Sequence, residues 1–279
     1  MHVYFNGDMM PKNEVSISPD DRGFIFGDGV YEVIVAYDGR FFRADAHFER
    51  LRRSLRALKI QEPDMAALRA IPEKLLRANN LEEGEATVYL QITRGAAPRK
   101  HPFPDKDTPV TVYGFASRFV ADESAWEDGV KVISVPDIRW MRCDIKSVSL
   151  LPNVLASQQA KENNAKEAIF VRDGAITEGA HTSFAAIFDG CFVTYPETHY
   201  ILPGITRTVA IGLCREFNIP VREFPILENE LKDADECMLL GTTTEVMPVV
   251  QVDDRMVGDG RPGPVTRKLQ NALRKLIRN

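Results

Sequence analysis

One lysine stands among apolar residues near the middle of the chain. Residues 142–155 read RCDIKSVSLLPNVL, so Lys146 has Ile145, Val148, Leu150 and further aliphatic residues around it. An unpaired lysine amine is costly to bury, and such a side chain usually extends its amine to water. The alternative is an amine kept neutral by desolvation, which can attack a carbonyl and form a Schiff base.

A Schiff-base lysine places demands on the rest of the chain. Its natural aldehyde partner is pyridoxal phosphate, whose phosphate needs an anion site. PGIT at 203–206 lies where a helix is predicted to begin, so backbone N–H groups and the Thr206 hydroxyl could bind a phosphate there. GTTTE at 241–245 is a second glycine–hydroxyl segment, and Arg50 in HFERLRRSL could add a cation. Taken singly, the two loop segments are better explained as ordinary loops rich in glycine and threonine, and Arg50 has the alternative of a solvated helix arginine.

A carboxylate and a basic loop complete the candidates. Glu178 in ITEG could pair with a pyridine nitrogen and keep it protonated, which makes the ring a better electron sink. Arg99 and His101 in APRKHPFP could bind a substrate carboxylate, because a guanidinium donates two parallel hydrogen bonds to one. The structural alternatives are a glutamate at the end of a hairpin and a basic exposed loop, and the residues alone leave both open.

The composition limits the class of protein. The chain has 279 residues, 44% hydrophobic and 27% charged, which fits one large soluble domain or two ordinary ones. A net charge of -5 argues against a general nucleic-acid binder, and no apolar run is long enough to cross a bilayer. The N-terminal MHVYFNGDMMPKNE lacks the layout of a signal peptide, so we expect a cytoplasmic protein. The dispersed cysteines and histidines predict neither a disulfide framework nor a metal site.

The elements that must position these residues begin with a strand and a hairpin. In DRGFIFGDGVYEVIVAYDGRFF, side chains alternate between the two faces of a predicted strand. One face carries Val30, Glu32 and Ile34, and the other carries Tyr31, Val33 and Val35. The Asp-Gly that follows favours a hairpin turn.

Two helical regions and two strands complete the predicted N-terminal lobe. Residues 44–60 have apolar side chains at helical spacing, with Asp45 as the predicted N-cap. A second helical region at 63–79 should be kinked or broken at Pro72. The long loop that carries Arg99 and His101 lies between strands at 86–93 and 109–116.

A polar stretch at 117–128 marks the expected boundary between an N-terminal lobe, residues 1–119, and a C-terminal lobe, residues 120–279, that carries Lys146. The C-terminal lobe has two hairpin signatures, each with Asp-Gly between apolar runs. Its predicted strands are 130–135, 167–171, 175–179, 183–188, 191–195, 236–241 and 248–252, and its predicted helices are 151–164, 202–217, 228–234 and 265–278. Hairpins outnumber β-α-β units, which predicts an α+β fold of two α/β lobes with mixed or antiparallel sheets.

These segments follow one family pattern in order along the chain. The sequence resembles the fold-type IV pyridoxal-phosphate enzymes, and among them most the bacterial D-amino acid transaminases. The resemblance runs almost end to end and rests on DRGF-x-FGDGVYEV, H-x-x-RL, TRG-x-x-PR-x-H, DIRW-x-RCDIKS, ITEG, ILPGITR and TTTE-V-x-PV. It implies the D-amino acid aminotransferase-like fold, with the cofactor between two lobes, and assembly as a homodimer.

The resemblance also implies roles at the cofactor. Lys146 would be the Schiff-base lysine and the proton shuttle. Glu178 would pair with the pyridine nitrogen, and Leu202 would pack against the ring. The phosphate would be bound by Arg50, Ile205, Thr206 and Thr242.

At the substrate, the resemblance implies that Tyr31 and Val33 line the pocket. Arg99 and His101 would hold the substrate's α-carboxylate, partly from the neighbouring subunit. The sequence departs from the family after ITEG, where a serine-rich stretch ending in asparagine is common. Here the residues are Ala180, His181, Thr182 and Ser183, so only part of the hydroxyl set is kept. A glycine, Gly241, also stands where relatives often have serine.

The implied reaction moves the amino group of a D-amino acid, such as D-alanine, to a 2-oxo acid, such as 2-oxoglutarate. Sibling reactions on the same fold are the alternatives: branched-chain L-amino acid transamination, (R)-amine transamination, or 4-amino-4-deoxychorismate lysis. The Arg-Lys-His loop favours the D-amino acid reaction. A cofactor carrier without turnover would need no substrate-binding groups, and a purely structural α/β protein would leave the ordered motifs unexplained.

Overall fold

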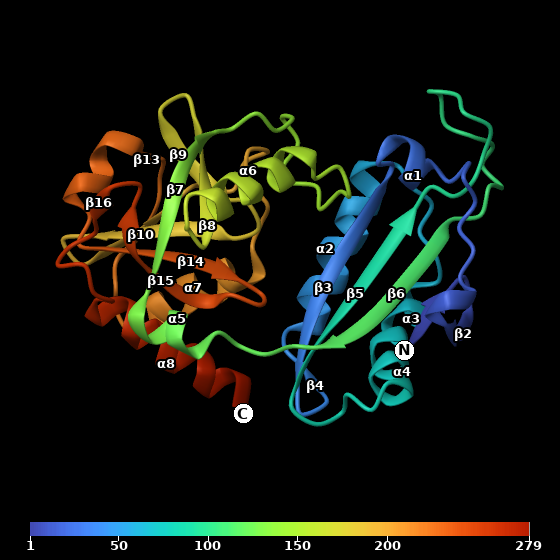
Figure 1. Ribbon diagram of the computed structural model, residues 1–279, viewed down its shortest axis with the longest axis horizontal. Helices are drawn as coiled ribbons and strands as arrows, with labels where there is room; N and C mark the ends of the chain where they lie inside the picture. The colour runs from blue at the N-terminus through green and yellow to red at the C-terminus, as the bar shows by residue number, and fades with distance from the viewer. Residues whose placement is uncertain (279) are drawn as a thin grey trace. The chain divides into compact units, whose positions relative to one another are not determined.

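The computed structural model describes residues 1–278, which divide into two compact units (Figure 1). The N-terminal unit comprises Met1–Val120 together with Ile145–Ser149. The C-terminal unit comprises Ala121–Asp144 and the chain from Leu150 onward. The sequence suggested a division after residue 119, next to this one. It assigned Lys146 to the C-terminal lobe, whereas the segment with this lysine groups with the N-terminal unit because its backbone bonds to a strand there.

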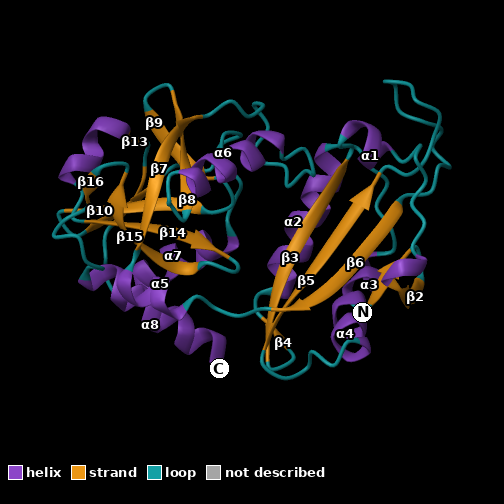
Figure 2. Cartoon of the chain, in the orientation of Figure 1, coloured by secondary structure: helices purple, strands orange, loops and turns teal. Residues whose placement is uncertain are grey.

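The N-terminal unit is built on an antiparallel sheet that has six strands among the described residues, in the order β2-β1-β6-β5-β3-β4. The strands are β1 (His2–Phe5), β2 (Asp8–Pro11), β3 (Gly29–Tyr37), β4 (Arg40–Phe41), β5 (Glu85–Thr93) and β6 (Thr111–Arg118). The helices are η1 (Lys12–Glu14), α1 (Arg22–Phe26), α2 (Ala44–Ala57), α3 (Met65–Arg69) and α4 (Ile71–Ala78). Helices α2 and α4 pack on one face of the sheet (Figure 1, Figure 2).

Side chains of β3 alternate between the two faces of this sheet, and the predicted pattern is confirmed. Val30 and Ile34 are buried in the apolar core on the helix-covered face. Glu32 lies between them and is completely buried. Tyr31 and Val33 lie on the opposite, half-buried face. The strand therefore presents a carboxylate to the core and a phenol to the other side.

Of two predicted helix boundaries, the break at Pro72 is confirmed and the N-cap of α2 is wrong. Pro72 does interrupt the second helical region, and it lies in the first turn of α4, where a missing N–H leaves no broken bond. Asp45 is not the N-cap of α2. Arg43 occupies that position in a left-handed conformation, with φ 55 and no side-chain cap. Asp45 lies one residue inside the helix, and its carboxylate pairs with Arg69 of α3 instead.

The C-terminal unit holds a mixed sheet, with ten strands among the described residues. Its order is β12-β11-β10-β14-β15-β7-β8-β9-β13, and β16 pairs with β15. The strands are β7 (Val130–Pro136), β8 (Glu167–Arg172), β9 (Ala175–Gly179), β10 (Ser183–Phe188), β11 (Cys191–Thr194), β12 (Val221–Glu223), β13 (Ile226–Leu227), β14 (Glu236–Gly241), β15 (Glu245–Val252) and β16 (Arg255–Met256). The helices are α5 (Glu123–Asp128), α6 (Leu151–Glu162), α7 (Ile205–Glu216), η2 (Glu228–Asp233) and α8 (Pro264–Arg278). The α+β fold with mixed and antiparallel sheets is confirmed.

Both Asp-Gly hairpins of this unit form as predicted. Asp173 and Gly174 join β8 to β9 with φ 51 and 77, and Asp189 and Gly190 join β10 to β11 with φ 48 and 73. Positive φ at both central residues is what a type I′ turn, the common two-residue hairpin loop, requires. The β8–β9 hairpin places the ITEG segment inside the sheet.

The apolar residues that follow Lys146 are only partly in a core, which corrects the first impression from the sequence. Ile145 is buried in the core of the N-terminal unit. Leu151, Val154 and Leu155 lie on α6 and are 70%, 60% and 54% exposed. The reason is that α6 buries its small residues, such as Ala156, against the sheet of the C-terminal unit and turns its larger apolar side chains outward.

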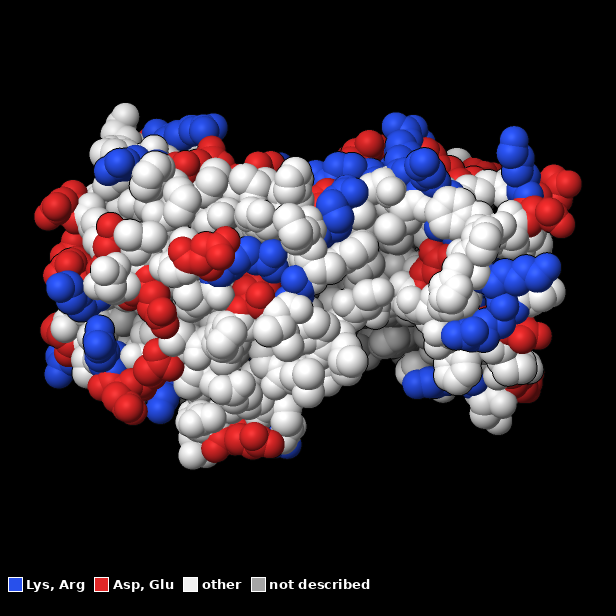
Figure 3. Space-filling model, turned by 90° about the horizontal axis from the view of Figure 1, so that it is seen from above, with Lys and Arg blue, Asp and Glu red and all other residues white. Residues whose placement is uncertain are grey.

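Charges on the visible face are interspersed. Figure 3 shows small groups of basic and of acidic side chains scattered among uncharged residues on the face in view. Among residues 1–278, no helix combines the length and apolar character needed to traverse a membrane.

Candidate active site

Lys146 is held by its backbone against β3, and its side chain lies on Tyr31. The Lys146 N–H donates to Ser54 Oγ at 3.2 Å, and the Lys146 carbonyl accepts from the Tyr31 N–H at 3.0 Å. Ser147 forms an isolated bridge with Val30. The Lys146 Nζ lies 4.3 Å from the centroid of the Tyr31 ring. The half-buried Lys146 side chain therefore extends from a fixed backbone and has a defined aromatic neighbour.

Arg50 is buried in an ion pair rather than solvated on its helix. Its Nε donates to Glu32 Oε1 at 2.7 Å and its Nη2 to Glu32 Oε2 at 2.9 Å. His47 Nδ1 lies 2.8 Å from Glu32 Oε2. Burial alone would raise the pKa of the Glu32 carboxyl, but Arg50 and His47 outweigh it and lower the pKa to about 2. Burial lowers the pKa of His47, so a neutral imidazole faces an ionised carboxylate.

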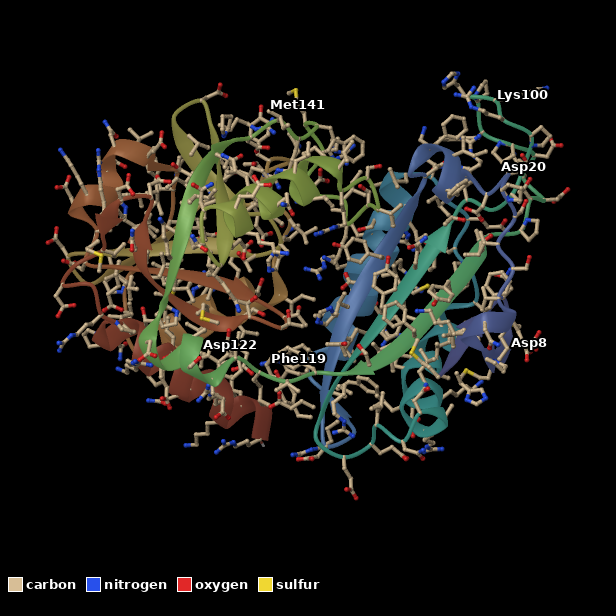
Figure 4. All side chains as sticks on the ribbon, in the orientation of Figure 1. Asp8, Asp20, Lys100, Phe119, Asp122 and Met141 are labelled. Atoms are coloured by element: carbon tan, nitrogen blue, oxygen red, sulfur yellow. The ribbon has the colours of Figure 1, made fainter. Side chains whose placement is uncertain are left out.

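Arg99 and His101 lie on the long loop between β5 and β6, as the sequence predicted. Figure 4 shows Lys100, which separates them, at the end of this loop beyond the sheet. Both side chains are exposed and pack on Phe26: the Arg99 guanidinium lies 5.4 Å from the ring centroid, and the two ring centroids of Phe26 and His101 are 5.6 Å apart. Two side chains suited to binding a carboxylate thus pack against one aromatic ring.

Glu178 lies on β9 in the C-terminal unit, and an arginine not foreseen from the sequence faces it. Arg139 Nη1 donates a short hydrogen bond to Glu178 Oε1, and the Leu202 N–H donates to Oε2 at 3.0 Å. Asp137 holds the other side of Arg139, with contacts of 2.9 Å to Nε and to Nη2. Arg172 contacts Asp137 as well, at 3.0 Å.

The protonation of this cluster follows from burial and charge. Burial raises the pKa of Glu178 to about 7, against the opposing effect of Arg139 and of the Leu202 N–H. Burial also acts to raise the pKa of Asp137, but Arg139 and Arg172 outweigh it and lower that pKa. Asp137 is therefore the firm anion of the cluster. Glu178 is a carboxyl that titrates near neutrality.

The predicted phosphate segments come together in the C-terminal unit. Gly204 precedes α7, which has no side-chain cap, so its first N–H groups point at whatever binds there. A Cβ at Gly204 would overlap Ser183 Oγ, and a Cβ at Gly241 would lie 3.1 Å from Thr182 Cγ2. Thr206 is 6% exposed at the start of the helix. Glycines at both loops thus keep open a cradle of N–H and hydroxyl groups, which fits a phosphate.

The residues that depart from the family stretch are tied to a buried carboxylate. Glu167 Oε1 accepts from the His181 N–H at 2.8 Å and from Thr182 Oγ1 at 3.0 Å. Burial raises the pKa of Glu167. Thr182 therefore directs its hydroxyl proton to Glu167 and offers lone pairs to other partners. The His181 ring is largely exposed.

Several supporting residues were not assigned any role from the sequence, among them Glu32, His47 and Arg139. For Glu32 a signal exists, because a carboxylate on the helix-facing side of a strand needs a buried cation. Arg139 stands in the DIRW phrase, but its partner Glu178 is 39 positions away. Only the folding of β9 beside the segment after β7 brings the two together.

Comparison with known proteins defines the class. The family profile described as amino-transferase class IV matches residues 29–252. The chain belongs to this family and is a pyridoxal-phosphate-dependent aminotransferase.

Its relatives narrow the assignment. The chain is 43% identical over 276 residues to a D-alanine aminotransferase of Staphylococcus haemolyticus. This match covers 99% of this chain and 97% of the relative. It is 41% identical to a D-alanine aminotransferase of Bacillus licheniformis, with 99% and 97% covered. Among solved structures, the branched-chain amino acid aminotransferase of Escherichia coli matches with a TM-score of 0.91 at 28% identity, covering 99% of this chain and 94% of that one.

Proposed function

We propose that this chain transfers the amino group of D-alanine, and of related D-amino acids, to a 2-oxo acid such as 2-oxoglutarate. Two full-length relatives named D-alanine aminotransferase, at 41 to 43% identity, support the substrate class. The observation that carries the chemistry is the position of Lys146: its backbone is held by hydrogen bonds to Ser54 Oγ and to the Tyr31 N–H, and its Nζ lies 4.3 Å from the centroid of the Tyr31 ring.

Pyridoxal phosphate, when bound, supplies a sink for the electrons left at the substrate's Cα. Lys146 would hold the cofactor covalently and later release it to the incoming amine. The freed Lys146 Nζ would take the proton from Cα and return it at the cofactor's C4′ carbon, on the far side of the substrate nitrogen. Glu178 would keep a proton on the ring nitrogen, with Arg139 fixing the orientation of the carboxylate.

The remaining cofactor contacts are assigned to residues that can bind an anion or pack on a ring. Leu202 would pack against the ring, and its N–H orients Glu178. The phosphate would be bound by Ile205 and Thr206 at the N-terminus of α7 and by Thr242 of the neighbouring loop. Arg50 would supply the cation. In this scheme Glu32 sets the direction of the Arg50 guanidinium.

The substrate would be held through its carboxylate. Tyr31 and Val33 would line the pocket, and Arg99 and His101 would bind the α-carboxylate. We propose that the enzyme is a homodimer in which a second copy supplies part of this carboxylate site. Exposed apolar side chains support a partner surface, since Phe24 of α1 and Phe103 of the loop are 78% and 56% exposed. A cytoplasmic location stays a prediction from the sequence.

The second candidate is branched-chain L-amino acid transamination. It is favoured by the solved structures, which at 25 to 28% identity are branched-chain amino acid aminotransferases of Escherichia coli and Thermoproteus uzoniensis. The higher identity of the D-alanine aminotransferases over the same length outweighs it.

A coupled assay separates the two. The purified enzyme is given D-alanine, L-alanine, L-leucine or (R)-1-phenylethylamine, each with 2-oxoglutarate. We expect pyruvate from D-alanine, with bleaching of the yellow cofactor band. Bleaching with L-leucine or the amine alone would overturn the substrate assignment and keep the cofactor roles. Product release without any 2-oxo acid would point to the lyase reaction.

A further inference from the structure

The loop that carries Arg99 and His101 is fixed to the N-terminal unit by a buried arginine. Arg22, the first residue of α1, is 4% exposed. Its Nη1 donates to the Lys100 carbonyl at 2.7 Å, and its Nη2 lies 3.4 Å from the His101 carbonyl. Its own N–H donates to the Gly95 carbonyl at 2.9 Å. Arg22 therefore bonds to the loop backbone on both sides of Arg99.

Asp28 holds Arg22 in place. Its Oδ2 accepts from Arg22 Nε at 2.9 Å and from Arg94 Nε at 2.8 Å, and its Oδ1 accepts from Arg94 Nη2 at 3.0 Å. Arg94 also donates to the Leu58 and Lys59 carbonyls at 2.7 Å and 2.8 Å. These carbonyls follow the end of α2, where a cation is favoured. One carboxylate thus joins two buried arginines into a rigid link from α2 to the loop.

The side chains of the loop are aligned by the same short helix. The Phe26 ring, four residues after Arg22, has the Arg22 guanidinium 4.8 Å from its centroid. The Arg99 guanidinium lies 5.4 Å from the same centroid. The His101 ring also packs there. Arg22 fixes the loop backbone, and Phe26 aligns the two side chains that leave it.

We propose that Arg22 is a positioning residue for recognition of the substrate carboxylate. This role rests on the proposed function, in which Arg99 and His101 bind that carboxylate. A bidentate contact works only when the guanidinium is held within a fraction of an ångström, and an exposed loop of this length does not hold it unaided. Arg22 supplies the missing order without touching the substrate.

Lysine cannot replace Arg22 in this role. Its single ammonium can pair with Asp28 or reach the Lys100 carbonyl, but it lacks the planar fork that does both at once. The test variant is therefore Arg22→Lys, which keeps the charge and most of the volume. Arg267→Lys is the matched control, because Arg267 also donates to a backbone carbonyl, that of Trp126 at 2.8 Å, in the C-terminal unit.

The holoenzyme variants are compared on two substrates, D-alanine and D-alaninol, in which a hydroxymethyl group replaces the carboxylate. The rate of bleaching of the yellow band gives a second-order constant for each. For Arg22→Lys we expect about a tenfold loss with D-alanine, mainly through KM, and less than about a twofold change with D-alaninol. Arg267→Lys should change neither. Equal losses on both substrates, or no loss on D-alanine, would overturn the role of Arg22.

Arg99→Gln is measured beside them to separate the two levels of the account. If Arg99→Gln selectively loses D-alanine and Arg22→Lys does not, the positioning role is wrong and the function stands. If Arg99→Gln affects both substrates equally, the carboxylate role of the loop is wrong, and the positioning role fails with it.

Trypsin gives a readout that does not depend on turnover, because the loop contains its own cleavage sites after Arg99 and Lys100. Loosening the backbone should raise the rate of cutting there. We expect about tenfold faster cleavage at this loop in Arg22→Lys, at a temperature where both proteins stay folded, and the parent rate in Arg267→Lys. An unchanged loop cleavage rate in Arg22→Lys would contradict the anchoring.

Discussion

Arg50 and Glu32 form a two-pronged ion pair inside the N-terminal unit, with Nε–Oε1 and Nη2–Oε2 distances of 2.7 Å and 2.9 Å. The glutamate comes from the strand that carries Tyr31, and the arginine comes from the helix packed on that strand. The ion pair therefore links Arg50, the proposed cation at the phosphate, to strand β3, which also holds the backbone of Lys146. Removing one partner leaves a buried charge without compensation.

Glu32→Gln should destabilise the protein by about 3 kcal/mol at neutral pH. The pKa of Glu32, ordinarily 4.5, is lowered to about 2, so the folded state binds this proton less readily than the unfolded state. The stability that the carboxylate contributes is present above pH 4.5 and is lost as the pH falls from about 4.5 to about 2. Urea unfolding of both proteins from pH 7 to pH 3 measures this.

The expected result is two stability curves that approach each other as the solution becomes acidic. Glu49→Gln, on the helix α2 that carries Arg50, is the control, because the Glu49 side chain is 61% exposed and its substitution should stay within about 0.5 kcal/mol of the parent. Parallel curves for the parent and Glu32→Gln would show that the pair does not set the acid response.

Glu178 should act with the opposite sign in the cofactor-free protein. Burial raises its pKa from 4.5 to about 7, so the stability linked to this group is full below pH 4.5 and is lost as the pH rises to about 7. Glu178→Gln should remove that loss, and thermal melting of the two apoproteins between pH 5 and pH 8 checks it. An identical pH slope in both would contradict a buried, titrating Glu178.

With cofactor bound, the same substitution should lower kcat by about 100-fold, because a neutral amide cannot keep the ring nitrogen protonated. Single-turnover bleaching with D-alanine measures the effect.

Arg139→Lys keeps a cation beside the Glu178 carboxylate and should retain more activity than Arg139→Leu. Equal activity in the two Arg139 variants would argue that Arg139 does not orient Glu178.

Gly204→Ala should weaken binding of the cofactor's phosphate by about tenfold. The backbone at Gly204 has φ -71, which alanine tolerates, so the effect comes from the Cβ that would displace Ser183 Oγ. Titration of the apoprotein with pyridoxal phosphate and with pyridoxal measures it, and only the phosphate-bearing ligand should be affected.

Gly212→Ala is the matched control on the same helix. A Cβ there meets nothing within 4 Å, so alanine should leave both affinities unchanged and stabilise α7 by about 0.5 to 1 kcal/mol. A phosphate-selective loss in this variant too would show that helix propensity, and not the cradle, explains the result.

Local patterns in the sequence predicted much of the fold because they depend on neighbouring residues. The Asp-Gly turns, the alternation along β3 and the break at Pro72 are of this kind. The cap of α2 was predicted wrongly, since Asp45 finds Arg69 rather than the helix end. That choice depends on a contact 24 positions away.

The supporting residues of the site could not be predicted from the sequence for the same reason: their contacts join positions far apart in the chain. Glu32 with Arg50, and Arg139 with Glu178, are pairs of residues that only the packed structure brings together. The segment with Lys146 illustrates the limit most clearly. Its apolar neighbours suggested a core, but α6 turns Leu151 and Val154 outward, and the lysine owes its place to backbone bonds with β3.

The central claim is that Lys146 holds the cofactor and moves the proton. Reduction of the holoenzyme with borohydride, followed by peptide mass mapping, locates the covalent link directly. We expect one modified peptide, containing Lys146, and in Lys146→Ala neither modification nor turnover of D-alanine, with noncovalent cofactor binding retained. A modified lysine at another position, or full turnover by Lys146→Ala, would contradict the account.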